Sequence, residues 1–96
     1  MKSVCRFTFS VAIARETVEA QLALAIIVAE CMYGQARVRL GAAYLMSGDG
    51  RKLVIDVSTE LGEHVAQLFT GLLIREMGEE AFSVERTERN LETTEG

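Results

Sequence analysis

The spacing of apolar residues changes period several times along this chain, and that alternation constrains the fold more than any other feature. From Cys5 to Val11 apolar and polar residues alternate, a period of two that is typical of a half-buried strand. From about Arg15 to Tyr33 the period becomes that of a helix, and Gly34 then supplies a stop signal. The chain therefore begins with a strand that is followed by a long helix.

The rest of the chain is predicted to continue in the order strand, turn, strand, helix and strand. The turn signal is Ser47-Gly48-Asp49-Gly50, which favours a hairpin, and Ser58 or Thr59 caps the second helix. The remaining strands are expected over residues 38–44, 53–57 and 81–86, and the helix ends at Gly78.

This order, β-α-β-β-α-β, predicts an α+β fold of the ferredoxin-like type. We expect a four-stranded antiparallel sheet with both helices on one face, because each predicted strand has a single apolar side. Within the 96 residues we assign one domain over residues 1–86 and an acidic flexible tail over residues 87–96. Whether the last strand pairs within the chain or with a neighbouring molecule stays open, since an end strand can do either.

Charge and hydropathy exclude several classes of protein. Residues 1–75 have a net charge of +1 and residues 76–96 a net charge of −5, which argues against a nucleic-acid binder that needs a positive field. The longest apolar run, Leu22 to Ala29, is far shorter than the roughly 20 residues of a membrane span. No apolar region of the signal-peptide kind follows the first residues, so we expect a cytoplasmic protein without membrane contact.

The first helix has more apolar surface than one sheet can cover. Its apolar arc is roughly 220° wide, whereas a surface helix needs a little over 100°. The excess predicts a contact with a second copy of the chain, a homodimer, because a self-complementary contact is the most economical partner. The alternative is that the small Ala20 and Ala23 let the second helix cover the rest. The predicted interface residues are Leu24, Ile27, Val28 and Cys31.

The open face of the predicted sheet carries four basic residues that could meet an acidic partner. They are Arg6, Arg37, Arg39 and Lys52. A sheet that reads RNA would also show aromatic residues on this face for base stacking, and the pattern places all of them on the other side. We therefore predict a solvated or partner-facing surface and not a nucleic-acid interface.

Residue patterns for catalysis, metal binding or cofactor binding are missing from the sequence. His64 is four residues after Glu60 on the polar side of the second helix. An exposed pair of these two side chains accounts for the histidine without a catalytic role. Cys5 and Cys31 are on apolar faces and are interpreted as small hydrophobic residues. We predict no catalytic residue, no metal and no cofactor; Asp56 and Glu85 would be the other acid-base groups of an enzyme.

Two known families bear on the function of this chain, and one of them, the ACT type of regulatory domain, shares the predicted topology. The run Phe7-Thr8-Phe9-Ser10-Val11, and later Gly50 to Val57 leading into a helix begun by Glu60, resembles the small dimerising subunit of the KEOPS tRNA-modifying complex over about residues 5–80. That resemblance implies a non-catalytic subunit that dimerises and docks a kinase-like enzyme. Regulatory domains of the ACT type also dimerise, although Glu16-Thr17-Val18 replaces their usual Gly-Leu step.

The leading hypothesis is therefore a small non-catalytic dimerisation, scaffold or accessory subunit that acts through its first helix. The alternative is an ACT-like regulatory domain that binds a small metabolite near the loops between strands and helices.

Overall fold

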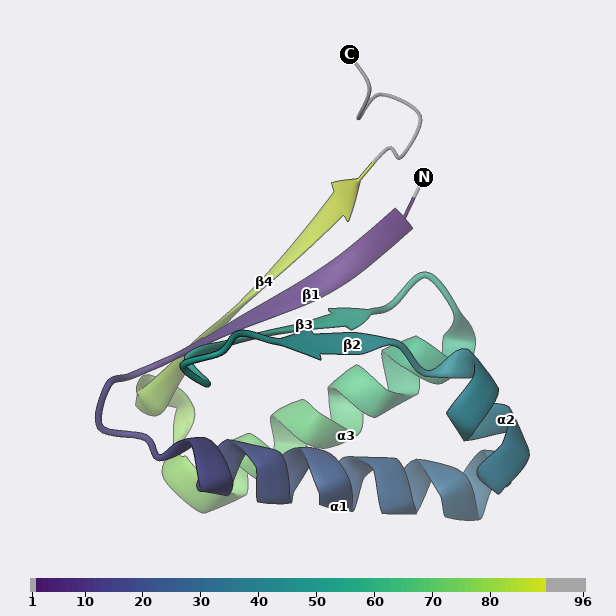
Figure 1. Cartoon of the computed structure of the whole chain (residues 1–96), viewed down its shortest axis with the longest axis horizontal. Coiled ribbons are helices and arrows are strands. Elements are labelled where there is room, and N and C mark those ends of the chain that lie inside the picture. Colours follow the sequence, from purple (N-terminus) through teal and green to yellow (C-terminus); the bar gives the residue numbers. More distant parts are fainter. Residues whose placement is uncertain (1, 90–96) are drawn as a thin grey trace.

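The computed structural model describes residues 2–89, which form a four-stranded antiparallel sheet with helices on one face (Figure 1). The spatial order of the strands is β2-β3-β1-β4. This arrangement confirms the predicted α+β, ferredoxin-like class. In chain order the elements are β1 (Lys2–Phe9), α1 (Arg15–Tyr33), α2 (Gln35–Gly41), β2 (Tyr44–Met46), β3 (Lys52–Asp56), α3 (Glu60–Met77), a 3-10 turn (Glu79–Ala81) and β4 (Phe82–Arg89).

The prediction of a strand over residues 38–44 is wrong. Residues Gln35–Gly41 form the short helix α2, and the strand shrinks to Tyr44–Met46. Gly34, with a φ of +91°, lets the chain turn directly from α1 into α2. Val38 is buried in the core, whereas Leu40 is 90% exposed, so the alternation of apolar residues does not report burial here. Gln, Ala, Arg and Leu are good helix formers, which fits the observed helix.

The last strand pairs within its own chain. β4 runs antiparallel to β1, with Phe82 opposite Phe9 at one end and Arg89 opposite Lys2 at the other. The strand is longer than predicted, so residues 87–89, assigned above to the tail, belong to the sheet. The remainder of the predicted tail, residues 90–96, lies outside the described residues.

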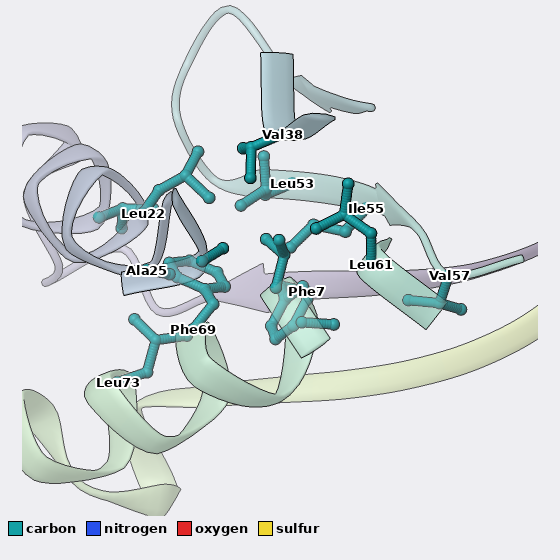
Figure 2. Close-up of a cluster of buried hydrophobic side chains, with 14 of the residues drawn as sticks. Phe7, Leu22, Ala25, Val38, Leu53, Ile55, Val57, Leu61, Phe69 and Leu73 are labelled. Carbon is teal, nitrogen blue, oxygen red and sulfur yellow. The ribbon is translucent and has the colours of Figure 1, made fainter. Parts of the chain in front are cut away.

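The core lies between the sheet and the helices, and phenylalanine rings occupy its centre (Figure 2). The rings of Phe7 and Phe69 meet edge to face, with 4.9 Å between their centroids. Such a contact adds about 0.5–1.5 kcal/mol beyond the burial of apolar area. Aliphatic residues from every layer surround this pair, among them Leu22, Ala25, Val38, Leu53, Ile55, Leu61 and Leu73.

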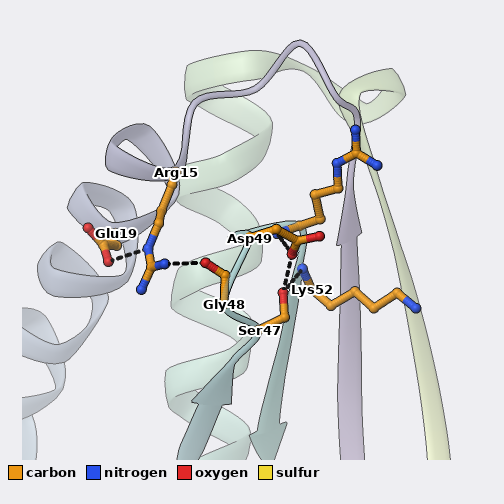
Figure 3. Close-up of polar contacts among 7 residues, drawn as sticks. Arg15, Glu19, Ser47, Gly48, Asp49 and Lys52 are labelled. Carbon is orange, nitrogen blue, oxygen red and sulfur yellow. Dashed lines mark hydrogen bonds and ion pairs between the residues drawn. The ribbon is translucent and has the colours of Figure 1, made fainter.

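The predicted hairpin turn forms between β2 and β3 (Figure 3). The Ser47 amide donates to the Lys52 carbonyl over 2.9 Å, and the Gly50 amide donates to the Ser47 carbonyl over 3.0 Å. One carboxylate oxygen of Asp49 accepts from the Ser47 hydroxyl (2.7 Å) and from the Arg51 amide (3.0 Å). These hydrogen bonds close the turn of a β-hairpin, as the sequence predicted.

Helix α3 begins against the end of β3 at a position that needs glycine. Thr59 caps the helix, because its hydroxyl oxygen accepts from the Gly62 amide over 3.0 Å. A Cβ atom on Gly62 would overlap the carbonyl oxygen of Asp56. The close approach of helix and strand at this point therefore depends on the absence of a side chain.

Candidate functional site

Helix α1 is apolar on its inner and its outer side. Val18, Ala25 and Ala29 are fully buried against the core. On the outside Leu24 and Ile27 are 46% and 54% exposed, although both are large aliphatic residues. The alternative in which α3 covers this surface is therefore wrong for these positions.

The exposed residues form a continuous stripe along α1. We call Leu24, Ile27, Val28, Cys31 and Met32 the outer stripe; all five are exposed. Their spacings of three and four residues place them on one side of a helix. The sequence predicted four of these residues, and the structure adds Met32. An exposed apolar stripe of this kind is typical of a contact with another protein.

A groove of about 560 Å³ runs beside the stripe, between α1, α2 and β2. Leu22, Ile26 and Met46 are among its apolar lining residues. Two ion pairs are at its rim. Arg15 reaches Glu19 (Nε to Oε2, 3.0 Å), and Arg39 reaches Glu30 (Nε to Oε2, 3.9 Å). An apolar groove with a few charged groups is the usual form of a small-molecule site.

The four basic residues predicted on the open sheet face do not lie together. Arg6 and Lys52 are in the sheet: Arg6 is opposite Glu85 in β4, and Lys52 is opposite Thr8 in β1.

Arg37 and Arg39 belong to α2, so their placement on the sheet is wrong for the reason given for that helix. The Arg37 guanidinium lies over the Tyr33 ring, 4.9 Å from its centroid. Arg39 instead reaches Glu30 at the groove rim. The four charges therefore form no common basic surface.

The histidine of the described region joins two helices. Nδ1 of His64 and the hydroxyl of Tyr33 share a hydrogen bond, so the end of α1 is tied to the first half of α3. The sequence paired His64 with Glu60, and the pairing with Tyr33 was missed because the two residues are 31 positions apart. No group of three or more potential metal ligands occurs in residues 2–89.

The two cysteines have different surroundings. Cys5 is half-buried beside the ion pair of Glu63 and Arg86, whose Oε2 and Nη2 atoms are 2.7 Å apart. Burial raises the pKa of the Cys5 thiol above its ordinary value of 9.0; the charge of Arg86 lowers this pKa and that of Glu63 raises it, both by less. Cys31 is exposed in the outer stripe.

Comparisons with known proteins support the fold alone. No family model matches the chain, and no curated protein sequence matches it significantly. None of the helices in the described region is long and apolar enough to cross a membrane. Among solved structures, the chain is similar to Rv0793 from Mycobacterium tuberculosis, with a TM-score of 0.50, 16% sequence identity and coverage of 93% of this chain and 94% of that one. The two proteins share an α+β fold.

Proposed function

We propose that this protein is a small non-catalytic dimerisation or accessory subunit that associates with a second copy through the outer stripe of α1. The observation that supports the proposal is the exposure of Leu24, Ile27 and Val28 on a helix whose other side is already buried in the core. Pairing the two stripes would remove these side chains from water, which contributes about 25 cal/mol per Å² of apolar area toward offsetting the entropy cost of association.

The size of the stripe sets the expected strength of the contact. The stripe runs from Leu24 to Met32, about 14 Å along the helix axis, so at a width of about 10 Å it covers roughly 140 Å². A stable interface buries about 800 Å² per partner. Because the stripe is much smaller than this, we expect the association to be weak and reversible. A role like that of the KEOPS small subunit, which docks a kinase-like enzyme, is one form of this proposal.

Charged substitutions on the stripe test the proposal against a matched control. Leu24→Glu and Val28→Glu would each place carboxylates in the interface, so the mass-average molecular weight at a fixed concentration should fall. Gln67→Glu adds the same charge at an exposed position of α3 and should leave the mass unchanged. Equal masses for all these variants and the original protein would reject the outer stripe as the contact.

The groove between α1, α2 and β2 favours a second proposal, an ACT-like regulatory role in which a small metabolite binds there. Ala23 lines this groove, so Ala23→Trp should fill part of it. A metabolite that raises the melting temperature of the original protein, and not that of the Ala23→Trp variant, would support this role. A flat response across a metabolite panel would exclude it for the compounds used.

A further inference from the structure

The two edges of the sheet differ in a way that bears on assembly. At one edge β2 has three residues, a length that offers little for another strand to pair with. At the other edge β4 has eight residues, and within residues 2–89 no strand pairs with its outer side. Long exposed edges invite pairing unless something prevents it. We propose that the outer edge of β4 pairs antiparallel with β4 of a second copy, so that one sheet runs through both molecules.

The backbone groups available for this pairing follow from the hydrogen bonds of β1. The Phe9 amide donates to the Arg51 carbonyl (2.8 Å), so odd-numbered residues of β1 bond toward β3. The Ser10 amide donates to the Ala81 carbonyl (3.0 Å), so even-numbered residues bond toward β4. Their partners in β4 are odd-numbered, so the backbone N–H and C=O groups of the even-numbered residues of β4 point away from β1, toward the outer edge. The residues whose backbone groups are available at this edge are Phe82, Val84, Arg86 and Glu88.

The charges of β4 match those of a second, reversed copy. The sequence from position 85 to 89 is Glu-Arg-Thr-Glu-Arg, and reading it backward inverts every charge. Antiparallel pairing centred on Thr87 therefore places Arg86 opposite Glu88 of the second copy, and position 85 opposite position 89. Opposite charges at directly facing positions stabilise a sheet by about 0.2–1 kcal/mol per pair, whereas like charges destabilise it.

Other registers of the β4 pair bring like charges opposite each other. A two-fold axis perpendicular to the sheet keeps each side chain on its own face, so the pairing can be centred only on a residue. Centring it on Arg86 or on Glu88 sets two like charges opposite each other. Centring it on Val84 brings Glu80 opposite Glu88 and places the second strand beside the 3-10 turn. The register centred on Thr87 alone among these has no like-charged pair.

Within residues 2–89, the geometry of the fold also leaves room at this end of β4. The ends of β1 and β4 near the N-terminus extend beyond the helices (Figure 1). A second copy that pairs around Thr87 would thus lie alongside the projecting part of the sheet. The outer stripe of α1 belongs to the helical layer, so the two contacts are separate and would join molecules into assemblies larger than a dimer.

Disulfide trapping tests the register directly. Thr87→Cys is made together with Cys5→Ser, Cys31→Ser and Leu24→Glu, so that other thiols and the α1 contact are removed. Facing residues that do not exchange hydrogen bonds have Cα atoms about 4.5 Å apart, within the range that a disulfide spans. Mild oxidation should therefore give a covalent dimer. Ser83→Cys in the same background is the control, because its two copies would be roughly 26 Å apart in this register.

A dimer from Thr87→Cys and none from Ser83→Cys would support the proposal. Equal cross-linking of both, or of neither, would overturn it. Val84→Cys covers the alternative register: a dimer from this variant without one from Thr87→Cys would also overturn the proposal as stated.

A charge exchange gives a second test that does not depend on oxidation. In the Leu24→Glu background, Glu88→Arg sets Arg86 against an arginine of the second copy and should raise the dissociation constant by roughly tenfold or more. Adding Arg86→Glu restores opposite pairs and should recover the association. Because Arg86→Glu also removes the ion pair with Glu63, circular dichroism checks the fold of each variant. Unchanged association in Glu88→Arg would contradict the proposal.

Discussion

Arg15 donates a hydrogen bond of 2.6 Å to the carbonyl oxygen of Gly48, which ties the start of α1 to the turn between β2 and β3 (Figure 3). The same arginine packs against Gly50, where a Cβ atom would be 2.8 Å from the Cβ atom of Arg15. Ala14 supplies no side-chain cap to α1, and this contact joins the first turn of the helix to the hairpin, in addition to the buried Val18.

Gly50→Ala should destabilise the protein for two reasons. Gly50 has a φ of +74°, which an alanine adopts only with strain, and the added methyl group would press on Arg15. We expect the free energy of unfolding to fall by about 1–2 kcal/mol. Gly48→Ala is the matched control, because nothing lies within 4 Å of a Cβ atom at that position. Urea unfolding would measure the free energy of unfolding of both variants, and an equal decrease in the two would contradict this prediction.

Gly71→Ala should stabilise the protein. Gly71 is an exposed residue inside α3, a Cβ atom there meets nothing within 4 Å, and alanine is the better helix former by about 1 kcal/mol. The position in α3 that needs glycine is Gly62, where a Cβ atom would overlap the carbonyl oxygen of Asp56. Gly62→Ala should therefore lower the melting temperature while Gly71→Ala raises it. A loss of stability in Gly71→Ala would point to a contact at this position that residues 2–89 do not contain.

The two cysteines should react at different rates. Burial raises the pKa of the Cys5 thiol, which reduces the fraction of reactive thiolate, whereas Cys31 is exposed on α1. At pH 8 we expect Cys31 to be alkylated by iodoacetamide at least roughly tenfold faster than Cys5. Peptide mass spectrometry over a time course would follow each site. Comparable alkylation rates would show that the side chains packed around Cys5 move aside readily.

Asp49 should contribute stability at neutral pH that disappears in acid. Its pKa is lowered from the ordinary value of 3.8, first by the Ser47 hydroxyl and then by the Arg51 amide, which both donate to the carboxylate. Because the folded-state pKa is depressed, the contribution is complete above pH 3.8 and is lost as the pH falls through the folded-state value. Asp49→Asn should therefore lower stability at pH 7 and have little effect in strong acid. A carboxyl carbon titration by NMR that gave an unshifted midpoint would contradict this.

The sequence predicted well the elements whose pattern is long. β1, α1, the hairpin and α3 each have a sustained period or a clear cap, and the structure contains all of them. The short α2 escaped prediction because a single buried residue, Val38, docks it to the core. Two alternating apolar residues, Val38 and Leu40, look the same in a strand and in a seven-residue helix, and only the packing of Val38 decides between them.

The candidate site shows the same division. The excess width of the apolar arc on α1 was legible in the sequence, and the outer stripe is exposed as that arc implied. Two features could not be predicted from a local sequence pattern, because they depend on how the helices cross. They are the hydrogen bond between Tyr33 and His64 and the groove beside α2. The two basic residues assigned to the wrong element, Arg37 and Arg39, moved because their segment is helical.

Self-association through α1 is the central claim, and solution mass measured by light scattering tests it most directly. The measurement is best made on Glu88→Arg, in which the proposed β4 pairing is disfavoured, from low to high micromolar concentration. We predict a mass that rises from 10.6 kDa toward twice that value, and that stays at 10.6 kDa when Leu24→Glu is added. A mass of 10.6 kDa for Glu88→Arg at every concentration, or a dimer that Leu24→Glu leaves intact, would contradict the claim.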